Sequence, residues 1–464
     1  MQNEKRSNFS GKIGFVLAAA GSAVGLGNIW RFPYLAAKYG GGIFLLTYLI
    51  LAVSFGFTLM TAEIALGRKT GLSVVGAFKS INKKFSFLGY LAALVPALIL
   101  PYYSVIGGWV MKYMSAFATG AISGVADGNY EGYFNSFITG VSQPLGWFLV
   151  FVGLTALIVW FGVEKGVERV SKIMMPVLVV LTICIAGFVL CQDRAMEGVK
   201  YYLLPDFSQF TVKTVLAAMG QLFYSMSLAM GIMITYGSYM KKEVSIETSV
   251  KQIEYFDTGI AFLAGLMIIP AIFFNSAPGV TPTVNKGPGL MFIELPGVFE
   301  KMGSLGTFVG IAFFVMVFFA ALTSSISLME TVVSIVRDKF KVGRKSACLI
   351  VLAFSLLLGV PSCLGYGVWS GATIIGMAFL DFFDFITNSV MMPIVALFTC
   401  VFVGYVIKPK AVTEEVELTG EFKKKTLFNV IIKYVAPVCI VLILVSSVLD
   451  ALASVIPALN MFKI

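Results

Sequence analysis

Histidine is absent from the 464 residues of this chain, and charged residues make up only 12% of it. Without histidine there is no His-based metal site, no histidine general base and no Ser-His-Asp triad. Ser-Lys or Asp-Asp pairs remain possible in principle, but Asp381 and Asp384 lie on one segment and no second acidic motif faces them. We therefore predict that the protein is not an enzyme.

Paired cysteines and long polar linkers are also missing. The six cysteines lie in or beside apolar stretches without close pairing, which indicates packing rather than a disulfide framework. They are Cys184, Cys191, Cys348, Cys363, Cys400 and Cys439. No linker separates two soluble domains, so we predict a single domain over 1–464.

Hydrophobic residues account for 58% of the chain, whereas soluble domains carry roughly 25% charged residues. Apolar stretches recur at 13–38, 42–67, 87–119, 145–163, 170–191, 211–239, 253–276, 305–336, 346–363, 380–407 and 427–448. Each is long enough to cross a bilayer as a helix, because about 20 residues at 1.5 Å rise span about 30 Å. The sequence predicts an all-α membrane protein with about eleven transmembrane helices.

The distribution of lysine and arginine predicts the orientation in the membrane. The first stretch continues through Arg31-Phe32-Pro33 and is followed at once by another span, so we do not expect a cleaved signal peptide. An internal N-terminus makes 1–12, 68–86, 164–172, 240–252, 337–345 and 408–425 cytoplasmic, and these segments hold 24 of the 34 Lys and Arg residues. The net charge of +10 then reports membrane orientation, not a nucleic-acid partner. An odd number of spans puts the C-terminus outside the cell membrane.

We expect the polar stretches between spans to be loops. The outer ones are 120–144, 192–210, 277–304 and 364–379; the last contains four glycines. The segment 408–425 mixes glutamates with lysines, and we interpret it as a solvated charge run.

Two spans are interrupted at corresponding places. The first contains Gly21-Ser22-Ala23-Val24-Gly25-Leu26-Gly27-Asn28, and the sixth contains Ser225-Met226-Ser227-Leu228-Ala229-Met230-Gly231. Paired breaks of this kind indicate an inverted repeat with a binding site at the breaks, although the standard example of that rule belongs to the family named below. We predict repeats at about 13–191 and 211–407, with an extra helix at about 427–448. Gly21-x-x-x-Gly25 alone is equally compatible with helix packing.

The first break continues as Gly27-Asn28-Ile29-Trp30-Arg31-Phe32-Pro33-Tyr34. Further motifs are Gly220-Gln221-x-x-Tyr224-Ser225, Thr235-Tyr236-Gly237-Ser238-Tyr239, Ala320-x-Leu322-Thr323-Ser324-Ser325 and Leu380-Asp381-x-x-Asp384-Phe385. With these motifs in order, the chain closely resembles the neurotransmitter:sodium symporter family, particularly its bacterial amino-acid transporters. The resemblance implies sodium-coupled symport of an amino acid by alternating access.

The resemblance implies two sodium sites. One would use carbonyls of Gly21, Val24 and Ala320 with the hydroxyls of Thr323 and Ser324, an all-oxygen set that suits a hard cation. On residue chemistry alone, serine and threonine in a helix more often bond back to the preceding turn. The other site would use Ala23, Asn28, Ser225 and Asp257.

Asp257 departs from the asparagine of the leucine transporter. An intramembrane carboxylate is expensive and usually functional; the alternative is an acid near a helix end. Chloride-independent relatives often carry a glutamate at the position matching Ala261, so we expect Asp257 to supply that negative charge and chloride not to be required.

The resemblance also implies a substrate site. It comprises Ala23, Gly25, Leu26, Gly27, Ile99, Tyr103, Tyr224, Ser225, Ser227, Met230, Ser324 and Leu328. Monoamine carriers of the family have an aspartate at the position of Gly25, so glycine favours an amino acid with its own carboxylate. The mostly apolar lining favours a hydrophobic or aromatic L-amino acid, and Met230 is an adaptable side chain.

Gates follow from the same resemblance. Arg31 and Asp384 would form the outer ion pair, and Arg6 with Asp338, near Tyr239 and Glu330, the inner one. An amino-acid sensor or a channel-like protein that retains this site without coupled transport stays open as an alternative. We expect membrane lipid to surround the protein, and we infer no protein partner from the sequence.

Overall fold

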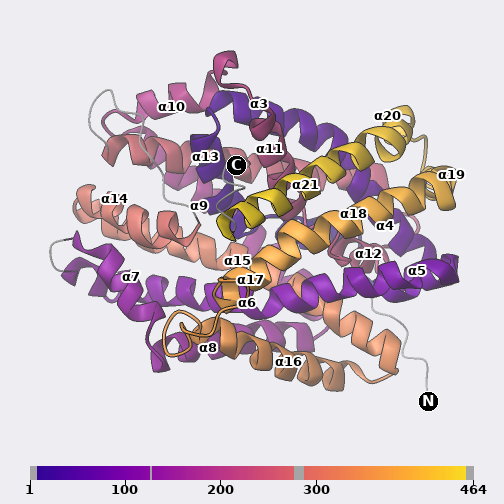
Figure 1. Cartoon of the computed structure of the whole chain (residues 1–464), viewed down its shortest axis with the longest axis horizontal. Helices are drawn as coiled ribbons and strands as arrows, with labels where there is room; N and C mark the ends of the chain where they lie inside the picture. Colours follow the sequence, from indigo (N-terminus) through magenta and orange to yellow (C-terminus); the bar gives the residue numbers. More distant parts are fainter. Residues whose placement is uncertain (1–7, 126–127, 276–286, 456–464) are drawn as a thin grey trace.

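The computed structural model describes residues 8–125, 128–275 and 287–455. Apart from the isolated bridges Gly41–Pro205 and Ile374–Met377, these residues form helices, turns and loops. Most long helices run roughly along the longest axis of the molecule (Figure 1). The predicted all-α fold class is confirmed.

The helices succeed one another along the chain as follows. They are α1 (Lys12–Ala23), α2 (Phe32–Lys38), α3 (Gly42–Leu51), α4 (Phe57–Thr70), α5 (Val74–Ile81), α6 (Ser86–Ala118), α7 (Tyr130–Ile138), α8 (Ser142–Trp160), α9 (Arg169–Leu190), α10 (Ala195–Leu203), α11 (Val212–Ser225), α12 (Ile232–Gly237), α13 (Ile246–Asn275), α14 (Leu295–Lys301), α15 (Ser304–Phe340), α16 (Arg344–Leu364), α17 (Phe379–Asp384), α18 (Met392–Val401), α19 (Lys410–Glu417), α20 (Lys425–Val430) and α21 (Ala436–Val455). Short π-helical turns join or flank several of them: η1 (Gly27–Arg31), η2 (Ala52–Gly56), η6 (Val163–Glu168), η8 (Leu290–Glu294), η9 (Phe385–Met391), η10 (Phe402–Val406) and η11 (Ile431–Val435).

Nine helices of the described chain are long and apolar enough to cross a membrane. A tenth candidate is the pair Lys12–Ala23 and Gly27–Lys38, bent by 52° at the first predicted break. The predicted span 211–239 is divided into α11 and α12 by residues 226–231, so neither part reaches the length of a span. Both predicted breaks are therefore present, while the count of eleven spans stays a prediction, as do the repeat boundaries.

Backbone geometry explains each break. α1 ends because Val24 adopts an extended conformation, with φ −74° and ψ 100°. In the second break, Ser227 and Ala229 have φ values of 53° and 60°, and Gly231 has 69°. Left-handed conformations are unfavourable for residues other than glycine, so surrounding contacts must hold this segment in place.

The expectation that polar stretches are simple loops is wrong at several places. The segments predicted to lie outside contain α7, α10 and α14, and those predicted to be cytoplasmic contain α5 and α19. In α14 Pro296 occupies the first turn, where a proline is compatible with a helix. The charged side chains of 408–425 are mostly exposed, as predicted for a solvated charge run, but Glu415 of α19 is an exception, because it is buried against Arg68 of α4.

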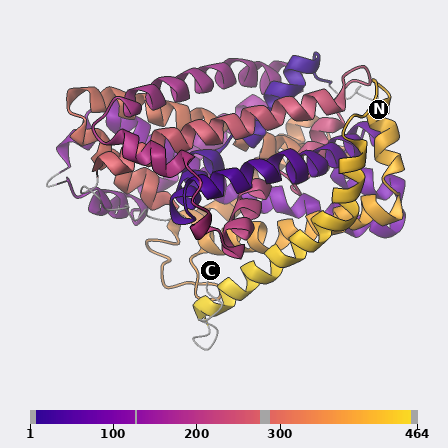
Figure 2. The same cartoon turned by 90° about the horizontal axis from the view of Figure 1, so that it is seen from above.

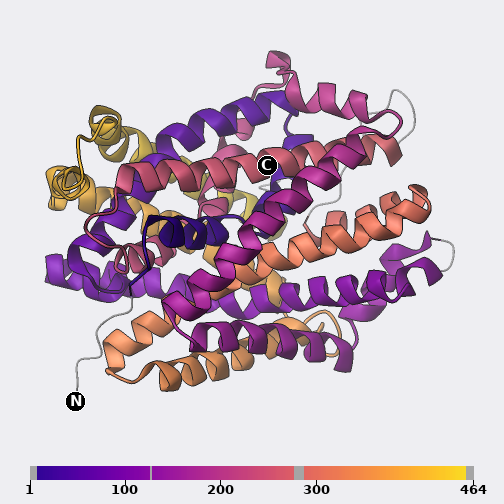
Figure 3. The ribbon, with the colours of Figure 1, turned by 180° about the vertical axis from the view of Figure 1, so that it is seen from behind.

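The packing of α6, α9 and α13 with α15 and α1 builds the centre of the molecule. Seen from behind, α9 crosses obliquely past its neighbours (Figure 3), and it contacts α1, α13 and α15. α21 lies at one edge (Figure 2) and packs mainly on α18. The two helix breaks thus lie inside the bundle.

Candidate functional site

A cavity lies at the two breaks. It is lined by Ser22, Ala23, Gly25, Leu26, Gly27, Ile99, Tyr103, Tyr224, Ser225, Ser227, Met230, Ile232, Ser324 and Leu328. All twelve predicted substrate-site residues are therefore brought together, from α1, α6, α11, α15 and the breaks. The sequence analysis did not assign Ser22 or Ile232 to the substrate site. The only available signal was their position, since Ser22 lies within the first predicted break and Ile232 directly follows the second.

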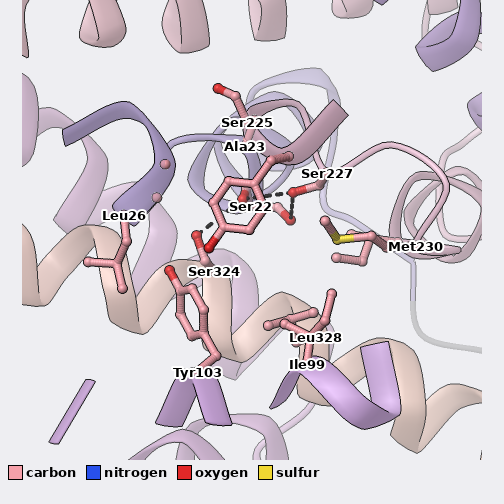
Figure 4. A pocket seen from close by; sticks show the side chains of 14 residues that line it. Ser22, Ala23, Leu26, Ile99, Tyr103, Ser225, Ser227, Met230, Ser324 and Leu328 are labelled. Carbon is pink, nitrogen blue, oxygen red and sulfur yellow. Dashed lines mark hydrogen bonds between the residues drawn. The ribbon is translucent and has the colours of Figure 1, made fainter. Parts of the chain in front are cut away.

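The cavity has a polar end and an apolar end. The hydroxyls of Tyr103 and Ser324 lie near each other at one end, and Ile99, Met230 and Leu328 gather at the other (Figure 4). The Tyr103 hydroxyl is buried and has no hydrogen-bond partner in the described chain. An unpaired buried hydroxyl is costly, so this end of the cavity suits a polar ligand group.

Two glycines keep the polar end open. A Cβ atom at Gly25 would lie 2.7 Å from the Ser324 Oγ and 3.2 Å from the Tyr103 hydroxyl. A Cβ atom at Gly27 would lie 2.6 Å from the ring of Tyr224. Any side chain at these positions would displace the surrounding groups or fill the cavity.

Backbone carbonyls of the first break converge on α15. The Ser324 hydroxyl lies 3.4 Å from the Gly21 carbonyl, 3.1 Å from that of Ser22 and 3.4 Å from that of Val24. The Thr323 hydroxyl donates to the carbonyls of Phe319 and Ala320 in the preceding turn of its own helix, which is the behaviour that residue chemistry alone predicts. Ser324 instead reaches across to α1. The five residues predicted for this sodium site lie together. Ser324 contacts Gly21 and Val24, and Thr323 contacts Ala320. A Cβ at Gly21 would lie 3.2 Å from the Thr323 Cβ.

Asp257 lies in the interior of α13 with 0% exposure, so it is not an acid at a helix end. Its Oδ1 accepts hydrogen bonds from Asn28 Nδ2 at 2.8 Å and from the Ser225 hydroxyl at 2.6 Å. Its Oδ2 accepts from the hydroxyl of Tyr48 on α3 at 3.1 Å. Ala23 lines the same cavity as Ser225. Tyr48 was not predicted, since nothing in its local sequence indicates this contact.

These two clusters can hold small hard cations. The described residues contain no group of three or more His, Cys, Asp or Glu side chains of the kind that binds a transition metal. Asp257 is also without a Lys or Arg ion-pair partner in the part of the chain that the structure describes; its partners are neutral donors. A buried carboxylate surrounded by hydroxyl, amide and carbonyl oxygens suits a monovalent cation by charge and by ligand hardness.

The predicted outer gate residues lie near the cavity. The Arg31 guanidinium stacks over the Tyr224 ring at 5.1 Å. Asp384 accepts hydrogen bonds from Tyr102 at 3.3 Å and from Asn388 at 2.7 Å. A direct ion pair between Arg31 and Asp384 stays a prediction.

Among the residues predicted for the inner gate, Tyr239 donates to Glu330 over 2.8 Å. Glu330 is fully buried and forms an ion pair with Arg344, a partner that sequence comparison missed. Asp338 accepts from the backbone of Ser73 at 2.8 Å. Arg6 lies outside the described residues, so its pairing with Asp338 also stays a prediction.

The chain matches the model of the sodium:neurotransmitter symporter family over residues 6–124 and 134–458. An uncharacterized sodium-dependent transporter of Bacillus subtilis is 37% identical over 96% of this chain and 98% of its own length. An uncharacterized sodium-dependent transporter of Haemophilus influenzae is 32% identical over 96% of this chain and 99% of its own length.

A more distant relative is the sodium- and chloride-dependent taurine transporter of the rat. It is 29% identical over 87% of this chain and 71% of its own length. Among solved structures, the crystal structure of MhsT in complex with L-phenylalanine superimposes with a TM-score of 0.86 at 37% identity. That alignment covers 95% of this chain and all of MhsT. The chain therefore belongs to the sodium:neurotransmitter symporter family: it is a sodium-dependent multi-pass membrane transporter and not an enzyme.

Proposed function

We propose that the protein takes up a hydrophobic or aromatic L-amino acid together with sodium by alternating access. The observation that carries this proposal is the cavity at the two helix breaks, which has hydroxyls at one end and aliphatic side chains at the other. The complex of the similar transporter MhsT with L-phenylalanine supports the same substrate class.

The substrate carboxylate would bind at the polar end. Its donors would be the backbone N–H groups of Leu26 and Gly27 and the hydroxyl of Tyr103. Unpaired N–H groups at a helix start favour an anion. The space around the Cα of Gly25 is open only because this residue has no side chain.

The ammonium group would face the second break. Carbonyls of Ala23, Tyr224 and Ser225 and the hydroxyl of Ser227 would accept from it. The Ser227 hydroxyl donates to the Ser22 carbonyl over 2.9 Å and accepts from the Ser22 hydroxyl at 3.2 Å, so one lone pair of its oxygen is left for the ligand. The hydrophobic side chain would then contact Ile99, Met230 and Leu328.

Two sodium ions would accompany the substrate as cargo. One would bind Ala23, Asn28, Ser225 and Asp257, and the other Gly21, Val24, Ala320, Thr323 and Ser324. Asp257 supplies a fixed negative charge beside the first ion, so we propose that transport needs no chloride. Attraction between unit charges at about 4 Å is about 4 kcal/mol at an effective dielectric constant of 20.

We further propose that the protein resides in the cell membrane with its N-terminus in the cytoplasm and its C-terminus outside. The excess of Lys and Arg in the segments assigned to the cytoplasm supports this orientation. Protease or cysteine-label access in sealed vesicles of known sidedness tests it.

The decisive experiment is uptake into proteoliposomes. Accumulation of radiolabelled L-phenylalanine, L-leucine or L-tyrosine against its gradient should require an inward sodium gradient. Equal uptake with external potassium or choline would contradict sodium coupling. Sodium-dependent binding without uptake by sealed, correctly oriented vesicles would instead identify an amino-acid sensor.

A further inference from the structure

A polar cluster at the start of the predicted tenth span lies beside the outer gate. Tyr102 of α6 places its hydroxyl 3.3 Å from Asp384, 3.3 Å from Thr387 and 3.2 Å from Asn388. Thr387 and Asn388 belong to the π-helical turn η9, which directly follows Asp384. π-Helical turns inside helices occur often at functional sites.

Within this cluster the orientation of the Asn388 amide is determined by its partners. The nitrogen Nδ2 lies 2.7 Å from Asp384 Oδ1. An ionised carboxylate only accepts hydrogen bonds, so the amide nitrogen must face it. The amide oxygen Oδ1 therefore points elsewhere, and it is buried without a hydrogen-bond partner in the described chain. The cluster thus contains an unused acceptor next to a carboxylate.

The matching unused donors belong to Arg31. Its guanidinium has five N–H groups and no acceptor. Among the described residues it has no hydrogen-bond or ion-pair partner, and it is held by stacking on Tyr224. Arg31 is half-buried.

We propose that Asn388 is a third residue of the outer gate. On closure the guanidinium of Arg31 binds the Asp384 carboxylate through one N–H group and Asn388 Oδ1 through another. A planar guanidinium favours two adjacent acceptors over one, because its N–H groups form a rigid fork. Tyr102 acts as a positioning residue that holds both acceptors. This inference rests on the proposed role of Arg31 and Asp384 as the outer gate.

Distances between spin labels on the outer side test the inference without any substrate. The labels are attached to Lys38→Cys at the end of α2 and Val368→Cys in the loop before α17, two exposed positions, after replacement of the six native cysteines. Samples in lipid nanodiscs compare the parent with Asn388→Leu, Asn388→Asp and Asn429→Leu. Asn429 of α20 is the matched control, since its Oδ1 is also buried without a partner.

We expect Asn388→Leu to shift the distribution toward the open, longer distance. We expect Asn388→Asp to shift it toward the closed one, because it replaces the amide that donates to Asp384 with a second carboxylate, and the repulsion between the two carboxylates is relieved only when the guanidinium binds both. Asn429→Leu should match the parent. In a second assay with L-phenylalanine, Asn388→Leu should release the ligand to the outside about tenfold faster, the effect of one charge-assisted hydrogen bond.

Two results would overturn the inference. One is that the distribution is unchanged in both Asn388 variants. The other is that both variants shift it in the same direction, as a purely structural role predicts. If Asn388→Leu does not fold, Asn388→Asp still decides by its direction. Failure of the wild type to bind L-phenylalanine in sodium would count against the proposed substrate and leave the distance result valid.

Discussion

Asn28, in the first helix break, donates a hydrogen bond from Nδ2 to Asp257 Oδ1 over 2.8 Å. The same nitrogen lies 3.1 Å from the Asp257 backbone carbonyl. The side-chain oxygen of Asn28 accepts from the backbone of Gly25 at 3.0 Å. One asparagine therefore connects the acid on α13 with the backbone beside the cavity, which joins the proposed ion and substrate sites.

The first prediction concerns Asp257 and chloride. Sodium-driven uptake by the wild type should persist when gluconate replaces chloride, since Asp257 supplies the negative charge. Asp257→Asn should abolish uptake or make it respond to chloride. The measurement is initial uptake in proteoliposomes at matched sodium concentrations. Strong chloride dependence of the wild type, or a variant indistinguishable from it, would refute this role.

The second prediction is that Gly25→Asp eliminates amino-acid binding. Its Cβ would lie within 2.7 Å of the Ser324 Oγ, and its carboxylate would repel that of the substrate. Sodium-dependent thermal stabilisation by the amino acid should disappear. Gly124→Asp is the control, because no atom lies within 4 Å of a Cβ built there. Native affinity in Gly25→Asp would place the substrate elsewhere.

The third prediction separates two adjacent serines of α15. Ser324→Ala should raise the sodium concentration for half-maximal uptake about tenfold, through loss of one bond to a charged group. Ser325→Ala should have little effect on it, because Ser325 pairs with Thr155 at 3.1 Å, away from the carbonyls of the first break. Sodium titration of uptake gives both values. Equal sodium dependence in the two variants would contradict the proposed ion site.

The fourth prediction is that Arg31→Ala lowers uptake at least about tenfold, because it removes both the stacking on Tyr224 and the gate charge. Arg31→Lys should recover only part of the rate, since an ammonium lacks the planar fork. Expression and melting temperature serve as controls for folding. Wild-type uptake by Arg31→Ala would discard the gate assignment.

The fifth prediction concerns a buried ion pair near the end of α4. Arg68 and Glu415 have side-chain exposures of 0% and 6%, and Arg68 also donates to the carbonyls of Val244 and Glu415. Glu415→Ala should destabilise the protein by about 3–5 kcal/mol, because it leaves a buried charge without its partner. Glu414→Ala, whose pair with Lys410 is exposed, should cost at most about 1 kcal/mol. Thermal unfolding in one detergent compares them, and equal losses would contradict the prediction.

Local patterns in the sequence account for the spans and breaks. Apolar length reports a membrane helix directly, because every backbone group within lipid must be satisfied inside the segment. Glycine-rich and serine-rich interruptions at 21–28 and 225–231 marked both breaks. Residue-by-residue comparison with a family then assembled the twelve cavity residues, which the structure indeed places around one cavity.

Contacts between distant segments could not be inferred in this way. Tyr48 and Asp257 are 209 positions apart, and Arg68 and Glu415 are 347 apart. The helix α19 has the composition of an exposed charge run, and only its packing against α4 shows that Glu415 is buried. The same holds for Arg344 beside Glu330 and for Asn388 beside Asp384.

By itself, then, the sequence determined that the chain lies in a membrane, its helical class and the two breaks, and its resemblance to a family supplied twelve of the fourteen residues that line the cavity. Tertiary structure decided which buried polar groups have partners, that the Asn388 amide oxygen beside Asp384 has none among the described residues, and which charged side chains are exposed. The physical reason is that a helix satisfies its own backbone locally, whereas a buried side-chain donor or acceptor is satisfied only by groups that folding brings from elsewhere.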